Sequence, residues 1–158
     1  MGPLFETVTD LATGAETIRR RSYGIIETAE GKLVGVHFRP WPSLITLPDV
    51  WLGDLYHGWT SGDRCWVFYN EPPGSPGYLA LTFAISNGET RLETTRCAAR
   101  VLDEIARLRQ ADAIVTEATC GRISDRLLAR WGWERHVLDS PLRHWIKRFY
   151  GVYPPALA

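Results

Sequence analysis

Hydrophobic residues in the second half of the chain recur with the period of a helix. Between 91 and 109 they fall at i, i+3, i+4, i+7 and i+10, which places them on one helical face. They are Ala98, Val101, Leu102, Ile105 and Leu108. Thr90 and Glu93 have the spacing of a capping box, so we expect this helix to begin at about Arg91.

A second helix is predicted over 122–131, because its apolar positions again share one side: Ile123, Leu127, Leu128 and Trp131. Gly132 is expected to end it, since glycine adopts the left-handed conformation of a helix C-terminus without steric cost. Trp133 would then fold back onto Leu128, as in a Schellman motif.

Short apolar runs predict the strands. Residues 23–28 and 33–38 indicate a hairpin, and a capping box of Thr13 and Glu16 predicts a short helix before it. Further strands are expected at 64–70, 78–85, 113–118, 135–138 and 143–149. The order strand, helix, strand, helix, strand in the second half favours an α/β fold with helices packed on a mixed sheet.

The segment 39–64 has no hydrophobic period and contains several prolines. Trp41, Trp51 and Trp59 lie in it and Trp66 follows it closely. Such dense aromatic residues form either a cover packed over the core or a ligand groove, and the cover is the commoner case. Long segments without regular structure are often functional.

Length and composition limit the class of protein to which this chain can belong. A chain of 158 residues without linkers or repeats predicts a single domain over 1–158. We see no signal peptide and no apolar run of membrane-spanning length, so we expect a cytoplasmic protein without a membrane partner. The three widely spaced cysteines, Cys65, Cys97 and Cys120, favour free thiols over disulfides or a metal site.

Charge argues against a nucleic-acid partner. The 18 basic and 18 acidic residues give a formal net charge of zero, which provides no general attraction to phosphate backbones. Residues 143–153 alternate basic and aromatic side chains, as an RNA-binding strand does. A closing strand with one buried aromatic face explains this alternation more simply.

The order of elements and the segment 126–133, which reads Arg-Leu-Leu-Ala-Arg-Trp-Gly-Trp, resemble the C-terminal half of the GNAT superfamily of acyl-CoA-dependent N-acyltransferases. The resemblance covers about 65–150, whereas 1–64 is divergent. It implies a single GNAT-like domain with a mixed, mostly antiparallel sheet, in which a central strand splays from its neighbour. It also implies acetyl-CoA or another acyl-CoA as cosubstrate, no metal, and a small-molecule or peptide amine as acceptor.

In this family, backbone N–H groups of the splayed strand contact the thioester, which points to Phe83 and Ile85. The residues matching the family's pyrophosphate loop are Thr95, Arg96, Cys97 and Ala98, with Arg100 close by.

This chain departs from the family pattern at several places, among them Gly121, which stands where the family often has Asn. Cys97 replaces the loop's first glycine, and Leu128 stands where the family often has a tyrosine acid. Glu93 would place a carboxylate near the phosphates. The alternative is therefore a non-catalytic GNAT-fold binding module that uses the aromatic 41–66 surface. A homodimer is compatible with either.

Two residues are candidates for the general base. His57 lies in the aromatic segment, and histidine is a common general base near neutral pH, although a structural histidine is the simpler interpretation. Glu117, near the end of the strand 113–118, would deprotonate an amine if it faces a cleft, or would otherwise face solvent at the strand terminus.

Overall fold

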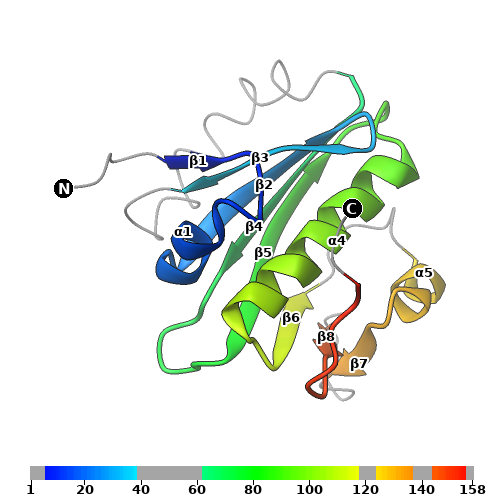
Figure 1. Ribbon diagram of the computed structural model, residues 1–158. Coiled ribbons are helices and arrows are strands. Elements are labelled where there is room, and N and C mark those ends of the chain that lie inside the picture. The colour runs from blue at the N-terminus through cyan, green and yellow to red at the C-terminus, as the bar shows by residue number, and fades with distance from the viewer. Residues whose placement is uncertain (1–5, 39–61, 118–123, 137–143, 156–158) are drawn as a thin grey trace.

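The computed structural model describes residues 6–38, 62–117, 124–136 and 144–155 (Figure 1). Along the chain the elements are β1 (Glu6–Val8), α1 (Ala15–Arg20), β2 (Tyr23–Ala29), β3 (Lys32–Phe38), β4 (Arg64–Asn70), β5 (Tyr78–Ser86), α4 (Leu92–Arg109), β6 (Ala113–Glu117), α5 (Asp125–Arg130), β7 (Glu134–His136) and β8 (His144–Arg148). The described strands form one sheet in the order β1-β3-β2-β4-β5-β6-β8-β7.

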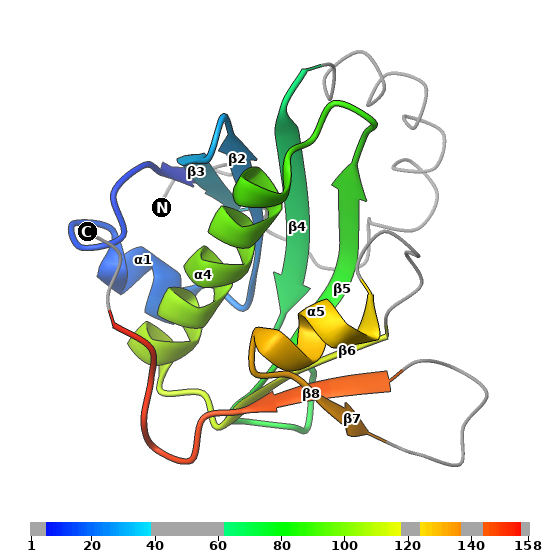
Figure 2. The same cartoon turned by 90° about the vertical axis from the view of Figure 1, so that its right-hand side faces the viewer.

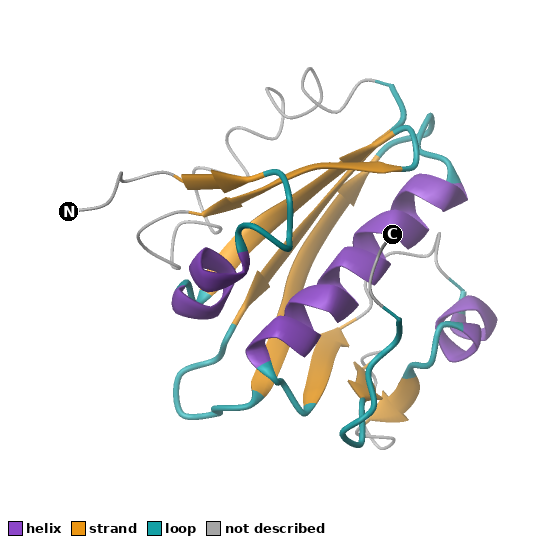
Figure 3. Ribbon diagram, in the orientation of Figure 1, coloured by secondary structure: helices purple, strands orange, loops and turns teal. Residues whose placement is uncertain are grey.

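Every neighbouring pair in this sheet is antiparallel except β5 and β6, which are parallel. Figure 3 shows α4 crossing one face of the sheet, with α1 beside it. The predicted α/β fold with a mixed, mostly antiparallel sheet is therefore confirmed. Of the predicted elements, the long helix agrees within one residue, whereas α5 begins at Asp125 rather than at 122.

The core lies between α4 and the sheet. The helical face predicted from the hydrophobic period is buried throughout, from Ala98 to Leu108. It packs against alternate residues of the central strands, among them Ile26, Val36 and Val67. Because side chains alternate along a strand, the residues between them face the opposite side of the sheet.

Both predicted capping boxes are wrong. The N-caps of α1 and α4 are Gly14 and Arg91, and neither makes a side-chain capping bond. The Thr90 hydroxyl instead donates to the Arg64 carbonyl at 2.6 Å and accepts from the Asn87 N–H at 3.0 Å. Thr90 therefore holds the β5–α4 connection against β4 and is not available to the helix.

The predicted end of α5 is confirmed. Gly132 has φ +93°, in the left-handed region. The Trp133 N–H donates to the Leu128 carbonyl at 2.9 Å and the Gly132 N–H to the Ala129 carbonyl at 3.1 Å, which is the bonding of a Schellman motif. Trp133 and Leu128 are both buried in the core.

A buried ion pair joins α4 to β8. Lys147 Nζ lies 2.7 Å from Asp103 Oδ2, and both side chains are more than nine-tenths buried. Burial raises the pKa of the Asp103 carboxyl, and the positive charge of Lys147 opposes that rise. The ion pair thus offsets part of the cost of burying the Asp103 carboxylate, a cost that would be high without a partner.

Breaking this pair on one side should destabilise the fold strongly. Lys147→Met leaves the Asp103 carboxylate unpaired, so we expect a loss of about 3–5 kcal/mol in urea unfolding at pH 7. Adding Asp103→Leu should recover most of the loss. Because the neutral carboxyl needs no partner, the penalty of Lys147→Met should shrink as the pH falls through the raised pKa of Asp103. A penalty independent of pH, or no recovery in the double variant, would contradict this account.

Gly132 should also be sensitive to substitution. In Gly132→Ala the new Cβ is strained by the positive φ and lies 3.3 Å from Lys147 Cε. We expect a loss of about 1 kcal/mol or more in thermal unfolding. Gly74→Ala is a matched control, since Gly74 has φ +80° with nothing within 4 Å of an added Cβ. Equal losses in the two variants would show that the contact with Lys147 adds nothing.

Candidate active site

The sheet opens between β5 and β6. Their pairing covers only Tyr78–Leu81 against Ala113–Thr116. Beyond this point β5 continues to Ser86 and pairs with β4 alone among the described residues. Figure 2 shows β5 running beside β4 while β6 diverges beneath α5. The splayed strand pair expected from the GNAT resemblance is present.

A β-bulge marks the point where the strands part. Phe68 pairs with Phe83 and Tyr69 pairs with Leu81, so Thr82 is an extra residue on β5. Its hydroxyl donates to the Phe68 carbonyl at 3.2 Å. A bulge bends its strand and increases the local twist, which explains why β5 follows β4 here and leaves β6. No pattern in the sequence predicts this bulge.

The hydrogen bonds at the two ends of the β2–β4 ladder show which way the amides of β5 point. The Glu30 N–H donates to the Asp63 carbonyl at 3.0 Å and the Glu71 N–H to the Ser22 carbonyl at 2.7 Å. Since hydrogen-bonded residues alternate in antiparallel pairs, odd-numbered residues of β4 bond to β2 and even-numbered residues bond to β5.

This alternation corrects the expected thioester contacts. Phe83 and Ile85 pair with the even-numbered Phe68 and Trp66, so their N–H groups point towards β4. The N–H of Ala84, between them, points towards the opening beside β6. The backbone donor available to a ligand is thus one residue away from the positions that the resemblance implied, because the register of β5 was not known from the sequence.

The start of α4 is fixed by short polar contacts. The Thr94 hydroxyl accepts from the Gly31 N–H at 2.9 Å, and the Thr94 carbonyl accepts from the Thr28 hydroxyl at 3.0 Å. The Asp63 carboxylate accepts from the backbone N–H of Arg91 at 2.8 Å and from its Nε at 2.7 Å. The backbone bond from Arg91 holds the pKa of Asp63 below its usual value. A carboxylate paired with the Arg91 guanidinium therefore lies at the N-terminus of α4.

The residues aligned with the pyrophosphate loop lie within the helix. The N–H groups of Thr94 and Thr95 both bond to the Arg91 carbonyl, at 3.1 and 3.2 Å. The amides of Arg96, Cys97 and Ala98 follow inside α4, where N–H groups bond to carbonyls one turn back. Because the amides of this segment bond within the helix, a ligand there would be contacted by its side chains.

Those side chains point in different directions. Ala98 is completely buried in the core. Cys97 is half-buried, and burial raises the pKa of its thiol. Arg96 places its guanidinium 4.9 Å above the Trp131 ring, and its Nη1 is buried without a hydrogen-bond partner. Arg100 is exposed one turn later.

Glu93 lies on another flank of α4. Its carboxylate is next to Gly31 in the β2–β3 turn, where an added Cβ would come within 3.0 Å of it. Two residues along a helix are separated by about 200° around its axis, so Glu93 and Thr95 point to nearly opposite flanks. Glu93 is thus in the first turn of α4 on the flank beside Gly31, whereas Asp63 is the carboxylate bonded to the Arg91 N–H.

The two predicted catalytic residues are only partly placed. Glu117 is the last residue of β6 and pairs through its backbone with His144. It lies one residue beyond the last β5–β6 pair, at the rim of the opening. The structure does not describe its side chain, and His57 lies outside the described residues.

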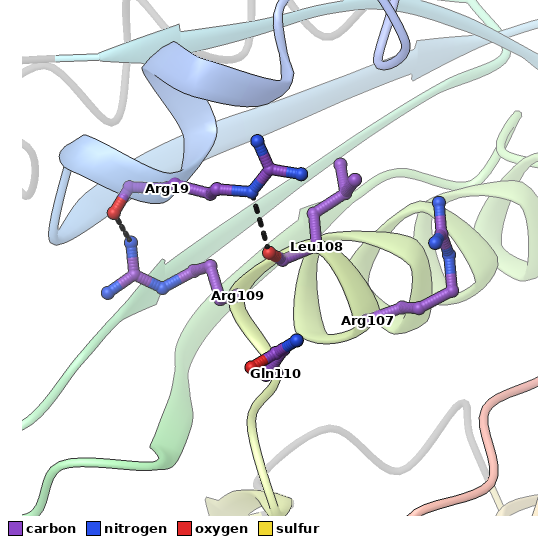
Figure 4. Close-up of a pocket in the computed structure, with 5 residues that line it drawn as sticks. All are labelled: Arg19, Arg107, Leu108, Arg109 and Gln110. Atoms are coloured by element: carbon purple, nitrogen blue, oxygen red, sulfur yellow. Dashed lines mark hydrogen bonds between the residues drawn. The ribbon is translucent and has the colours of Figure 1, made fainter.

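Several grooves lined by described residues adjoin α4 away from the opening. The first, of about 820 Å³, lies between α4, the β2–β3 turn and the residues after β1, and includes Cys97, Arg96 and Arg100 in its lining. The second, of about 530 Å³, lies at the C-terminal end of α4 (Figure 4). There Arg19 Nε donates to the Leu108 carbonyl at 3.2 Å and Arg109 Nη1 to the Arg19 carbonyl at 3.0 Å. Two of the arginines that line the second groove, Arg19 and Arg109, therefore already donate to backbone carbonyls of α4 and α1.

Among the described residues, no group of three or more His, Cys, Asp or Glu side chains is placed to hold a metal ion. None of the described helices is long and apolar enough to cross a membrane.

Comparison with known proteins gives one distant likeness. No family model matches the chain, and no curated protein matches it. Among solved structures, a crystal structure of nourseothricin acetyltransferase is similar over 92% of this chain and 99% of its own, with 16% identity and a TM-score of 0.39. This likeness is too distant to identify the chain.

Proposed function

We propose that this protein is an acyl-CoA-dependent N-acyltransferase that binds the thioester in the opening between β5 and β6. The observation that carries the proposal is the N–H of Ala84, which points into that opening at the bulge. A rigid backbone N–H there would donate to the thioester carbonyl oxygen and stabilise the negative charge that develops on it during attack.

The reaction requires that the amine and the thioester are held close together and that a base accepts the proton of the amine. The amine nitrogen of the acceptor attacks the thioester carbonyl carbon, and the bond from that carbon to sulfur breaks. The amine loses a proton to the base, and the leaving thiolate takes up a proton. Holding amine and thioester together removes much of the entropic cost.

Glu117 is our candidate for the base. Its place at the end of β6, beside the opening, supports this role, because a carboxylate there would be close to an amine that approaches the thioester. His57, in the aromatic segment, remains the second candidate. Acetyl-CoA is the simplest acyl donor, and a small-molecule or peptide amine is the acceptor class.

A non-catalytic binding module is the second candidate function, and the start of α4 favours it. Phosphates bind helix N-termini through free N–H groups and the positive end of the helix dipole. Here the Asp63 carboxylate is bonded to the Arg91 N–H, and no glycine-rich loop precedes the helix. Any binding of the CoA phosphates at this place must overcome that charge.

Acetyl-CoA should raise the melting temperature of the protein, because a ligand that binds only the folded state stabilises it.

Ala84→Pro removes the proposed donor without removing a bond to β4. We expect it to lower kcat/KM for acetyl-CoA by about 10²-fold or more, measured as thiol release with a panel of amines. Ala84→Gly keeps the N–H and should retain most activity. Equal activity of the two variants would contradict the assigned donor, and absence of acetyl-CoA binding would favour the binding module.

Removing the charge at the helix start should strengthen binding of acyl-CoA. Asp63→Asn keeps an oxygen acceptor for the Arg91 N–H but removes the carboxylate. We expect tighter CoA binding in calorimetry, most clearly at low salt, where charges are least screened. Glu93→Gln also removes one negative charge, but from the opposite flank of α4, and should change the affinity for CoA less. A larger effect of Glu93→Gln would place the phosphates in the groove beside Gly31 instead.

A further inference from the structure

A chain of four polar side chains crosses the sheet near its β1 edge. His37 Nδ1 lies 3.0 Å from Thr7 Oγ1, and His37 Nε2 lies 2.9 Å from Glu27 Oε1. Arg64 Nη1 donates to the other Glu27 oxygen, Oε2, at 3.2 Å. These residues belong to β1, β3, β2 and β4, whereas their neighbours Val8, Val36 and Ile26 face α4. The network therefore lies on the sheet face opposite α4.

When His37 is neutral, its partners determine the direction of each hydrogen bond. Glu27 is buried, with a side chain only 8% exposed, and Arg64 supplies the opposite charge. A carboxylate is an acceptor only, so His37 Nε2 carries a proton and donates to it. In the neutral imidazole Nδ1 is then an acceptor, and the Thr7 hydroxyl donates to it. The proton of the Thr7 hydroxyl is thus aimed at a base that Glu27 orients.

This is the arrangement that activates hydroxyl nucleophiles, namely a hydroxyl bonded to an imidazole whose other nitrogen is held by a carboxylate. The side chains of Thr7 and His37 can also be reached from solvent. Thr7 is exposed on an edge strand and the His37 side chain is 32% exposed, while Glu27 is sequestered behind them. Val8 anchors β1 in the core, so the hydroxyl of Thr7 is not needed to hold the strand.

We propose that Thr7 is an activated nucleophile that accepts acyl groups from activated carboxylic esters, with His37 as its base and Glu27 as a positioning residue. Thr7 Oγ1 attacks the carbonyl carbon of the ester while His37 Nδ1 takes the hydroxyl proton. The bond from that carbon to the leaving oxygen breaks, and the proton passes from His37 to the leaving group. The product is an acyl ester of Thr7, at a place separate from the opening between β5 and β6.

The test uses p-nitrophenyl acetate and mass spectrometry of the full chain. We expect addition of one acetyl group, located on Thr7 by peptide mapping. Thr7→Val, which keeps the shape but lacks the hydroxyl, should abolish it, and His37→Gln should slow it by about 10²-fold. Thr9→Val is the matched control, since Thr9 is an exposed threonine nearby, and should label as the wild type does.

The Glu27→Gln variant distinguishes a positioning role of Glu27 from a role in folding alone. Loss of the carboxylate removes the acceptor that orients His37 Nε2, so Thr7 acetylation should slow while the circular dichroism spectrum stays that of the wild type. Absence of label on Thr7, or labelling at an equal rate in His37→Gln, would overturn the proposal. Because the probe contains no CoA, these results are independent of whether the protein binds acyl-CoA.

Discussion

The bulge at Thr82 is the feature on which the candidate site depends. β5 is paired with β4 along most of its length but with β6 only over Tyr78–Leu81, and the change occurs where β5 carries one extra residue. The extra residue twists the strand away from β6 and also shifts the alternation of its amides. One backbone irregularity thus creates the opening and decides that the N–H of Ala84, and not that of its neighbours, faces it.

The long helix α4 is held at both ends and in the middle by polar contacts, in addition to its apolar face. Thr94 ties its start to the β2–β3 turn, Asp103 pairs with Lys147 in the interior, and Arg109 bonds to carbonyls of α1. These contacts fix the start of α4 relative to the sheet. At that start the Asp63 carboxylate bonds to the Arg91 N–H, so this contact would oppose the proposed binding of acyl-CoA phosphates there.

Features with a local cause could be predicted from the sequence. The apolar face of α4 follows from the helical period, and the left-handed Gly132 follows from the need for glycine at a helix end. The capping box of α4 failed because long-range partners decided that terminus: Thr90 bonds to Arg64 and Asp63 bonds to Arg91. At α1, Thr13 instead donates to the nearby Asp10 carbonyl. The choice of Phe83 and Ile85 failed for a related reason, since the register of β5 is set by its pairing with β4.

The network of Thr7, His37 and Glu27 shows the same limit more sharply. The three residues lie on different strands and are brought together only by the pairing of β1 with β3 and of β3 with β2. No spacing in the sequence connects them, and each by itself is an ordinary strand residue. Chemistry that depends on contacts between strands therefore needs the register, which the hydrophobic pattern alone does not provide.

Amide hydrogen exchange of β5, measured by NMR with and without acetyl-CoA, tests the central claim most directly. The account predicts that the Ala84 amide exchanges much faster than the amides of Phe83 and Ile85 in the free protein, because only theirs bond to β4. It also predicts that acetyl-CoA slows exchange at Ala84 and leaves its two neighbours nearly unchanged. Slow exchange at Ala84 in the free protein, or exchange there that acetyl-CoA does not alter, would contradict it.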